Sequence, residues 1–196
     1  MFDDNRVREV PMAGPQRSRY HRAMTRDADP SDRVPPVEVS RRIEAPAPRI
    51  FAVLANPSNH VVLDGSGTVR GVVSDSVISS VGDVFVIRMF FERLGEYEMN
   101  NHVVEFERDR HIGWEPEAGR GHPNEGTTAA SWGQRWSYEL VPDGPDVTVV
   151  TERYDCSRVP AAEQIGMDGG RIWRSAMATT LERLDELSTG RSFSGG

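Results

Sequence analysis

The feature that most constrains the fold is a helical pattern near the end of the chain, from about Asp168 to Ser188. Its apolar residues recur in steps of three and four, the period of one face of an α-helix and not that of a strand. The stripe consists of Ile172, Trp173, Ala176, Met177, Thr180, Leu181, Leu184 and Leu187. Most of the chain before it is patterned as strands, so we expect this helix to pack its apolar stripe onto a sheet.

Stretches typical of β-strands precede the helix, and turn residues separate them. They are Val37–Glu44, Thr68–Val73, Asp83–Phe91, Glu96–Glu107, His111–Glu115, Ser131–Val141 and Asp146–Asp155. Two short helical segments, Ile50–Leu54 and Ser58–Leu63, separate the first strand from the others. A sheet of this length is expected to curl because its strands twist. The sequence therefore predicts an α+β fold, in which a cavity remains wherever inner side chains do not fill the space between sheet and helix.

Composition divides the chain into three parts. Residues 1–35 carry many charges and prolines but few spaced apolar residues, so we expect a disordered N-terminal extension that cannot offset its ordering entropy. Within this extension, Met24 is a candidate for an alternative start. Residues 36–190 are expected to form a single domain, and residues 191–196 a frayed tail.

Charge and composition exclude several classes of function. The net charge is -7 and there is no basic run, which argues against nucleic acid or an anionic membrane as the partner. No apolar run is long enough for an integral membrane helix, and the first residues lack the apolar core of a signal peptide. The single cysteine, Cys156, excludes an internal disulfide and fits a cytoplasmic location.

Three segments resemble one known superfamily. Residues 43–60 (IEAPAPRIFAVLANPSNH), 63–72 (LDGSGTVRGV) and 136–155 (WSYELVPDGPDVTVVTERYD) are similar to segments of the SRPBCC superfamily, also called START-like. The similarity is to its actinobacterial polyketide cyclase/dehydrase and lipid-transport types. It covers roughly residues 36–188 and implies the helix-grip fold, a curved antiparallel sheet of about seven strands wrapped around a long C-terminal helix. Because members include cyclases, carriers, hormone receptors and co-chaperone activators, the fold does not select a function.

A helix-grip pocket is expected to be largely apolar, with a few polar groups that orient the ligand. The candidates for its lining are His60, Asp64, Phe85, Trp114, Trp136, Trp173, Ala176, Met177 and Thr180. The alternative is that most of the aromatic residues are ordinary core, and that Asp64 forms a turn by accepting backbone hydrogen bonds. Since Ala176 and Thr180 are small, we expect the cavity to be widest beside them and Ala176→Phe to block it.

Three strand residues are candidates for moving protons in such a pocket: His102, Glu152 and Tyr154. The pattern puts His102 on one face with Val104 and Phe106. If this face is concave, the imidazole lies in an apolar pocket and its pKa is free to be tuned. The alternative is that His102 lies on the convex, solvated face.

Glu152 has two alternative environments. A carboxylate is costly to bury without a partner, so on the surface it would pair with Arg88, Arg135 or Arg153. Inside the pocket it would bind a ligand hydroxyl, and a raised pKa would suit it to general acid–base chemistry.

No metal or organic cofactor is expected, since the histidines show no helical i, i+4 pairing and no cysteine pair lies near them. The leading hypothesis is binding of a small hydrophobic or polycyclic molecule, lipid-like or polyketide-like. The alternatives are an aromatic polyketide cyclase/dehydrase that shuttles protons in the same cavity, and a protein-interaction module resembling heat-shock ATPase activators. A homodimer is left open.

Overall fold

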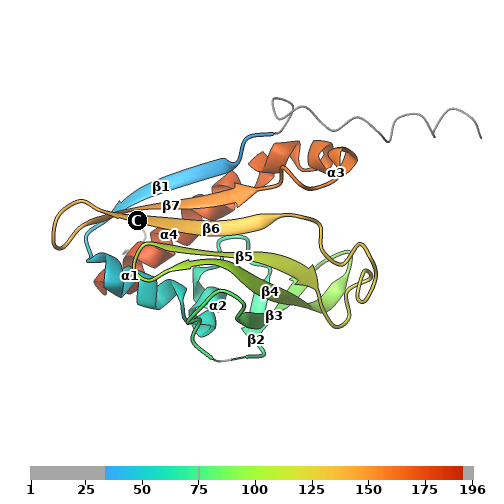
Figure 1. The fold of residues 1–196 in the computed structure, drawn as a ribbon, viewed down its shortest axis with the longest axis horizontal. Helices are drawn as coiled ribbons and strands as arrows, with labels where there is room; N and C mark the ends of the chain where they lie inside the picture. Colours follow the sequence, from blue (N-terminus) through green and yellow to red (C-terminus); the bar gives the residue numbers. More distant parts are fainter. Residues whose placement is uncertain (1–33, 75, 192–196) are drawn as a thin grey trace, which may run out of the picture. The chain divides into compact units, whose positions relative to one another are not determined.

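The computed structural model describes residues 34–74 and 76–191, which are built around one antiparallel sheet (Figure 1). The strand order is β1-β7-β6-β5-β4-β3-β2. The strands are β1 Val37–Ile43, β2 Val69–Val72, β3 Val84–Phe91, β4 Gly95–Glu107, β5 His111–Ala118, β6 Arg135–Pro142 and β7 Thr148–Asp155. Each predicted strand is present, because alternating burial marks a strand clearly even where its ends shift by a few residues.

Helices pack against the same sheet. The connection from β1 to β2 contains α1 Ala47–Leu54, η2 Pro57–Asn59 and α2 His60–Leu63, and β7 is followed by α3 Ala161–Gly166, η3 Asp168–Trp173 and α4 Arg174–Thr189. Helix α4 packs on β1 and β7 and against α1 and α2. Its residues Met177, Leu181 and Leu184 are buried. This arrangement confirms the predicted α+β helix-grip fold.

The long helix begins later than its apolar stripe suggests. Gly169 and Gly170 have φ of 60° and 88°, so a kink lies inside η3, and the regular α-helix α4 starts only at Arg174. A Cβ on Gly170 would lie 2.6 Å from Cδ1 of Tyr154, so this glycine lets the chain pass close to the sheet. As a result Ile172, expected to point inward, is 54% exposed.

A β-bulge in β4 changes which of its side chains face the helix. The β4–β5 register shifts between Val103 and Glu105, so Val104 is an extra residue on β4. Phe106 is thereby returned to the concave side, where its ring lies 5.4 Å from that of Phe51. His102 stays on the convex side, with a side chain that is 43% exposed. The predicted common face of His102 and Phe106 is therefore wrong, because a strict two-residue alternation ignores the bulge.

The sheet opens beyond the middle of β5. Strands β5 and β6 pair only from His111↔Glu139 to Trp114↔Trp136, whereas β5 continues to Ala118 beside β4. Past Trp114, β5 no longer pairs with β6, so that edge of β5 is free of strand pairing. A proline such as Pro116 is tolerated there because it has no N–H to donate to a neighbouring strand. The strand therefore runs three residues past the predicted end at Glu115, and the long loop to β6 leaves from this opening.

Among residues 34–74 and 76–191, no helix is long and apolar enough to cross a membrane. The predicted extension, residues 1–35, lies outside the described residues except for its last two. The predicted tail, residues 191–196, lies outside them except for Arg191.

Candidate ligand-binding site

A cavity of about 340 Å³ lies between the concave face of the sheet and α4. Its wall is formed by the sheet, by α4, by the turn between α2 and β2, by the loop before β6 and by α3. The polar and aromatic lining residues are His60, Asp64, Ser66, Thr68, Tyr97, Asn101, Trp114, His122, Trp132, Gln134, Trp136, Tyr138, Glu152, Glu163, Trp173 and Thr180. The volume is near the lower end of the roughly 300–1,000 Å³ of known ligand pockets.

Aromatic rings form much of this wall, and all four tryptophans of the chain belong to it. Trp114 on β5 and Trp136 on β6 are paired across the two strands, so both indoles point into the cavity. The ring centroids of Trp136 and Trp173 are 6.1 Å apart, and those of Trp114 and Tyr138 are 5.9 Å apart. The alternation on β5 and β6 thus brings together an aromatic surface of the kind that binds flat apolar molecules.

Glu152 is the buried acid of the cavity. It is 3% exposed, and its Oε1 accepts a hydrogen bond of 2.9 Å from the hydroxyl of Tyr138. Its Oε2 is buried without a hydrogen-bond partner among the described residues. Burial is the main cause that raises the pKa of Glu152 to about 8; the Tyr138 hydrogen bond lowers it, and the charge of Asp64 raises it. At neutral pH the carboxyl is therefore mostly protonated and offers a hydrogen-bond donor to the cavity.

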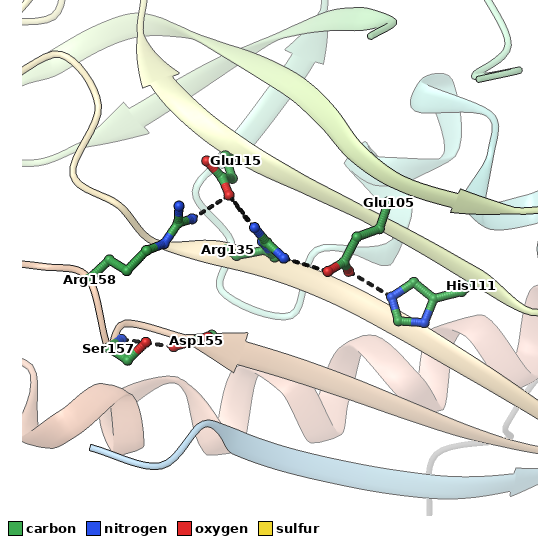
Figure 2. Close-up of polar contacts among 7 residues, drawn as sticks. All are labelled: Glu105, His111, Glu115, Arg135, Asp155, Ser157 and Arg158. Atoms are coloured by element: carbon green, nitrogen blue, oxygen red, sulfur yellow. Dashed lines mark hydrogen bonds and ion pairs between the residues drawn. The ribbon is translucent and has the colours of Figure 1, made fainter. Parts of the chain in front are cut away.

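Arginine does not neutralise this acid, contrary to one of the sequence-based alternatives. Arg135 lies on the convex face, where Nη1 is 2.5 Å from Glu105 Oε1 and Nη2 is 2.6 Å from Glu115 Oε1 (Figure 2). Arg158 also binds Glu115, and His111 binds Glu105, so these five side chains form one chain of ion pairs across the outer surface, apart from the separate contact between Ser157 and Asp155 in Figure 2. Partial burial raises the pKa of Glu115, but the hydrogen bonds from the two arginines outweigh it and lower the pKa below its usual value.

His60 forms part of the cavity floor. Its ring stacks on Trp114 with centroids 5.3 Å apart, and its Nε2 lies 2.9 Å from the carbonyl oxygen of Leu54. Because a carbonyl only accepts, Nε2 carries the proton and Nδ1 of the neutral ring is an acceptor. Burial lowers the pKa of His60, against the hydrogen bond to Leu54 and the charge of Asp64, which raise it. The imidazole is therefore uncharged at neutral pH.

Asp64 holds the turn between α2 and β2. Oδ1 accepts hydrogen bonds from the backbone N–H and the hydroxyl of Ser66, at 3.0 and 2.6 Å, and Oδ2 accepts one of 2.8 Å from the N–H of Val69. Three donors thus fix the carboxylate at the cavity wall, as the turn alternative expected. The backbone N–H of the next residue, Gly65, donates to Thr180 Oγ1 at 3.1 Å and joins this turn to α4.

The rim of the cavity contains a second histidine, His122. His122 is half-buried between Tyr97 and Trp132, with ring centroids 5.1 and 5.0 Å away. Its Nδ1 accepts the N–H of Asn124 at 3.1 Å, so the proton of the neutral ring is on Nε2. Burial lowers the pKa of His122 as well.

Three predicted site residues do not reach the cavity. His102 lies on the convex face, where its Nε2 is 3.0 Å from Glu117 Oε2. Tyr154 is fully buried behind the wall, and its hydroxyl donates to Gln134 Oε1 at 2.8 Å. Burial raises the pKa of the Tyr154 hydroxyl, which removes it further from proton transfer near neutrality. Phe85 packs behind His60, at a centroid distance of 5.2 Å, and is core.

The other predicted lining residues do face the cavity: His60, Asp64, Trp114, Trp136, Glu152, Trp173, Ala176, Met177 and Thr180. Tyr97, Asn101 and Gln134 also line the cavity and were not predicted from the sequence. Asn101 is 2% exposed and lies on the inward face of β4 with Met99 and Val103. Before the bulge, the alternation in β4 does place Asn101 on one face with Met99 and Val103. The sequence of β4 alone does not show that this face points toward the cavity.

Among the described residues, no group of three or more His, Cys, Asp or Glu side chains is arranged to hold a metal ion. His60 and His102 are on opposite sides of the sheet, and His111 is bound to Glu105 at 2.7 Å. Cys156 is 1% exposed, and burial raises the pKa of its thiol, so it is not a reactive thiolate at neutral pH.

The chain is similar to a sequence relative and to solved structures of the same fold. No protein-family model matches the chain. A sequence relative, the uncharacterized protein Rv0088 of Mycobacterium tuberculosis, is 34% identical over 122 residues, which are 61% of this chain and 48% of the relative. The chain therefore spans about half the length of the curated relatives it matches.

Solved structures share the architecture at low sequence identity. A solution NMR structure of a protein from Arthrobacter aurescens has a TM-score of 0.61 and 13% identity, and covers 80% of this chain and 87% of that one. One from Staphylococcus epidermidis has a TM-score of 0.60 and 12% identity, with coverage of 82% and 93%. These likenesses concern the fold alone. The chain thus has a helix-grip fold, and this architecture fits its resemblance to the SRPBCC superfamily.

Proposed function

We propose that the chain binds a small hydrophobic molecule with a ring system in the cavity between the sheet and α4. The observation that carries this proposal is Glu152, whose buried Oε2 has no partner among the described residues and which belongs to an aromatic cavity wall. A buried polar group left unsatisfied costs about 1–3 kcal/mol, so a ligand group that meets it gains binding energy. Apolar walls with few polar groups are the usual composition of small-molecule pockets.

The size of the cavity limits the ligand. A volume of about 340 Å³ suits a compact molecule of about two fused rings and is too small for a long lipid chain. The polar group of this molecule is placed at Glu152, and its ring system lies against Trp114, Trp136 and Trp173.

Filling the cavity is expected to abolish binding without unfolding the chain. Ala176→Phe, on the cavity side of α4, should weaken binding of 1-naphthylmethanol at least about tenfold, because the new ring occupies the ligand's space. Isothermal titration calorimetry measures the affinity, and circular dichroism checks the fold. Ser175→Phe is the matched control, since Ser175 is the neighbouring exposed residue of the same helix.

Val69→Phe provides a second plug from the opposite wall. If both plugged variants fold and bind the probe as the native chain does, the ligand does not occupy this cavity. Native mass spectrometry of protein purified from its own host gives an independent test. A co-purifying small molecule that is absent from the Ala176→Phe variant supports the proposal.

A second candidate is an enzyme of the aromatic cyclase/dehydrase kind in the same cavity. The observation in its favour is the pKa of Glu152 of about 8, which suits a group that gives and takes protons near neutral pH. Once a co-purifying molecule is known, incubation with native protein and with Glu152→Gln separates the two functions. Turnover that is lost in Glu152→Gln identifies an enzyme, and a molecule recovered unchanged from both identifies a binding protein.

A further inference from the structure

The cavity wall is acidic and contains no permanently positive side chain among the residues described. The chain has 23 arginines and no lysine, and none of the arginines within residues 34–74 and 76–191 lines the cavity. Three carboxyl groups do: Asp64, Glu152 and Glu163. The two histidines of the wall, His60 and His122, are neutral because burial lowers the pKa of each. A negatively charged ligand would therefore enter without any counter-charge, which is costly inside a protein.

Two of these acids, Asp64 and Glu152, favour a positively charged ligand group over a neutral one. Asp64 accepts three hydrogen bonds at the wall, and its negative charge acts on Glu152, Tyr138 and His60. Glu152 is 3% exposed and its Oε2 has no partner in the described structure. A positive group beside Oε2 would meet both the missing hydrogen bond and the surrounding negative potential.

The aromatic wall favours the same kind of group. Indole and phenol faces attract cations through their quadrupole, and tryptophan does so most strongly. Trp114, Trp136 and Trp173 are all part of the wall, together with Tyr138, which binds Glu152 directly. Aromatic faces combined with a buried carboxyl are thus suited to an ammonium group attached to an apolar body.

We propose that the cavity binds a small organic cation, namely a protonated amine on a compact apolar ring system. This rests on the proposed function, since it assigns the polar group of that same ligand. The ammonium N–H donates to Glu152 Oε2, and the ring system packs against the tryptophans. When the amine binds, Glu152 releases its proton to solvent, and the resulting carboxylate pairs with the ammonium.

Three probes with the same ring body test the charge preference on the native chain. They are 1-naphthylmethylamine, 1-naphthylmethanol and 1-naphthoate, which are cationic, neutral and anionic at neutral pH. At pH 8 we expect the amine to bind at least about tenfold more tightly than the alcohol, and the naphthoate to bind most weakly. Isothermal titration calorimetry gives the three dissociation constants, and no variant is needed for this comparison.

The pH dependence tests the role of Glu152. The groups that act on its charge are Tyr138 on β6 and Asp64 in the turn before β2. His60 on α2 belongs to the same cavity wall and is acted on by Asp64. Because the amine needs the ionised carboxylate, its affinity should rise by about tenfold or more between pH 6 and pH 8, while the affinity of the alcohol should not rise. Glu152→Gln should abolish this rise, and Glu139→Gln, an exposed carboxylate on the convex face of β6, should retain it.

The outcomes separate the two proposals. If the alcohol or the naphthoate binds as tightly as the amine, the proposal of an organic cation is wrong. The proposal that the cavity binds a ring-containing molecule is then still supported. If none of the three probes binds at about millimolar concentration, the cavity is not a site for such molecules and both proposals fail. If the amine is preferred but Glu139→Gln alone removes the preference, the cation binds elsewhere and the inference is overturned.

Discussion

Replacing Glu152 with glutamine is expected to remove a pH dependence of stability that the native chain carries. The pKa of Glu152 is raised from about 4.5 to about 8 by folding, so the folded chain keeps a proton that the unfolded chain releases. Stability therefore falls as the pH rises from about 4.5 to 8 and is level above that range. The full loss is on the order of 5 kcal/mol, since each pKa unit corresponds to about 1.4 kcal/mol.

Urea unfolding between about pH 5 and pH 9 measures this effect through the free energy of unfolding. In Glu152→Gln the side chain is uncharged throughout, so the fall should be absent and the variant should exceed the native chain in stability at pH 9. Glu139→Gln, on the convex face, should keep the native profile. If the free energy of unfolding depends on pH in the same way in the native chain and in Glu152→Gln, the Glu152 carboxyl is not buried in a protonated state. Glu115 acts in a different range, because its lowered pKa gives stability that is lost only on acidification below its ordinary pKa.

Adding one methyl group at Gly65 is expected to have the largest effect on the fold. A Cβ there would lie 2.1 Å from the carbonyl oxygen of Ala176 and 2.9 Å from the backbone nitrogen of Thr180. Both neighbours are backbone of α4, so the turn and the helix must separate. Gly65→Ala should lower the free energy of unfolding by about 3 kcal/mol or more and weaken the bond from Gly65 N–H to Thr180.

Gly67→Ala is the matched control for this substitution. Gly67 has a φ of 70° but nothing lies within 4 Å of the position of a Cβ, so only the backbone strain of about 1 kcal/mol is expected. Thermal unfolding of both variants gives the comparison. Equal losses would show that the close approach of turn and helix does not limit stability.

The strands and the amphipathic helix could be predicted from the sequence because their periodicity is local. The errors occur where a single residue interrupts that periodicity. The extra residue at Val104 separates the faces of His102 and Phe106, and two glycines with positive φ delay the start of α4 to Arg174.

The environment of Glu152 could not be decided from the sequence. Its partner Tyr138 is 14 residues away along the chain, and the charge that acts on it belongs to the distant Asp64. The two-residue period of a strand puts Glu152 on the same face as Val150 and Tyr154, and all three are buried. Alternation does not show on which side of the sheet these three residues lie, because that depends on where α4 packs. Arg135 lies on the convex face beside Glu105 and Glu115, and this position likewise depends on how the strands pair in the folded sheet.

All four tryptophans lie in the cavity wall, so the intrinsic fluorescence of the chain reports on the cavity. Indole emission depends on the polarity of the surroundings, and here no tryptophan lies elsewhere to add a constant background. Entry of an apolar molecule would replace solvent beside all four rings together and move their emission to shorter wavelength. The same ultraviolet signal, followed in time, would report how fast the cavity fills and empties without any added label.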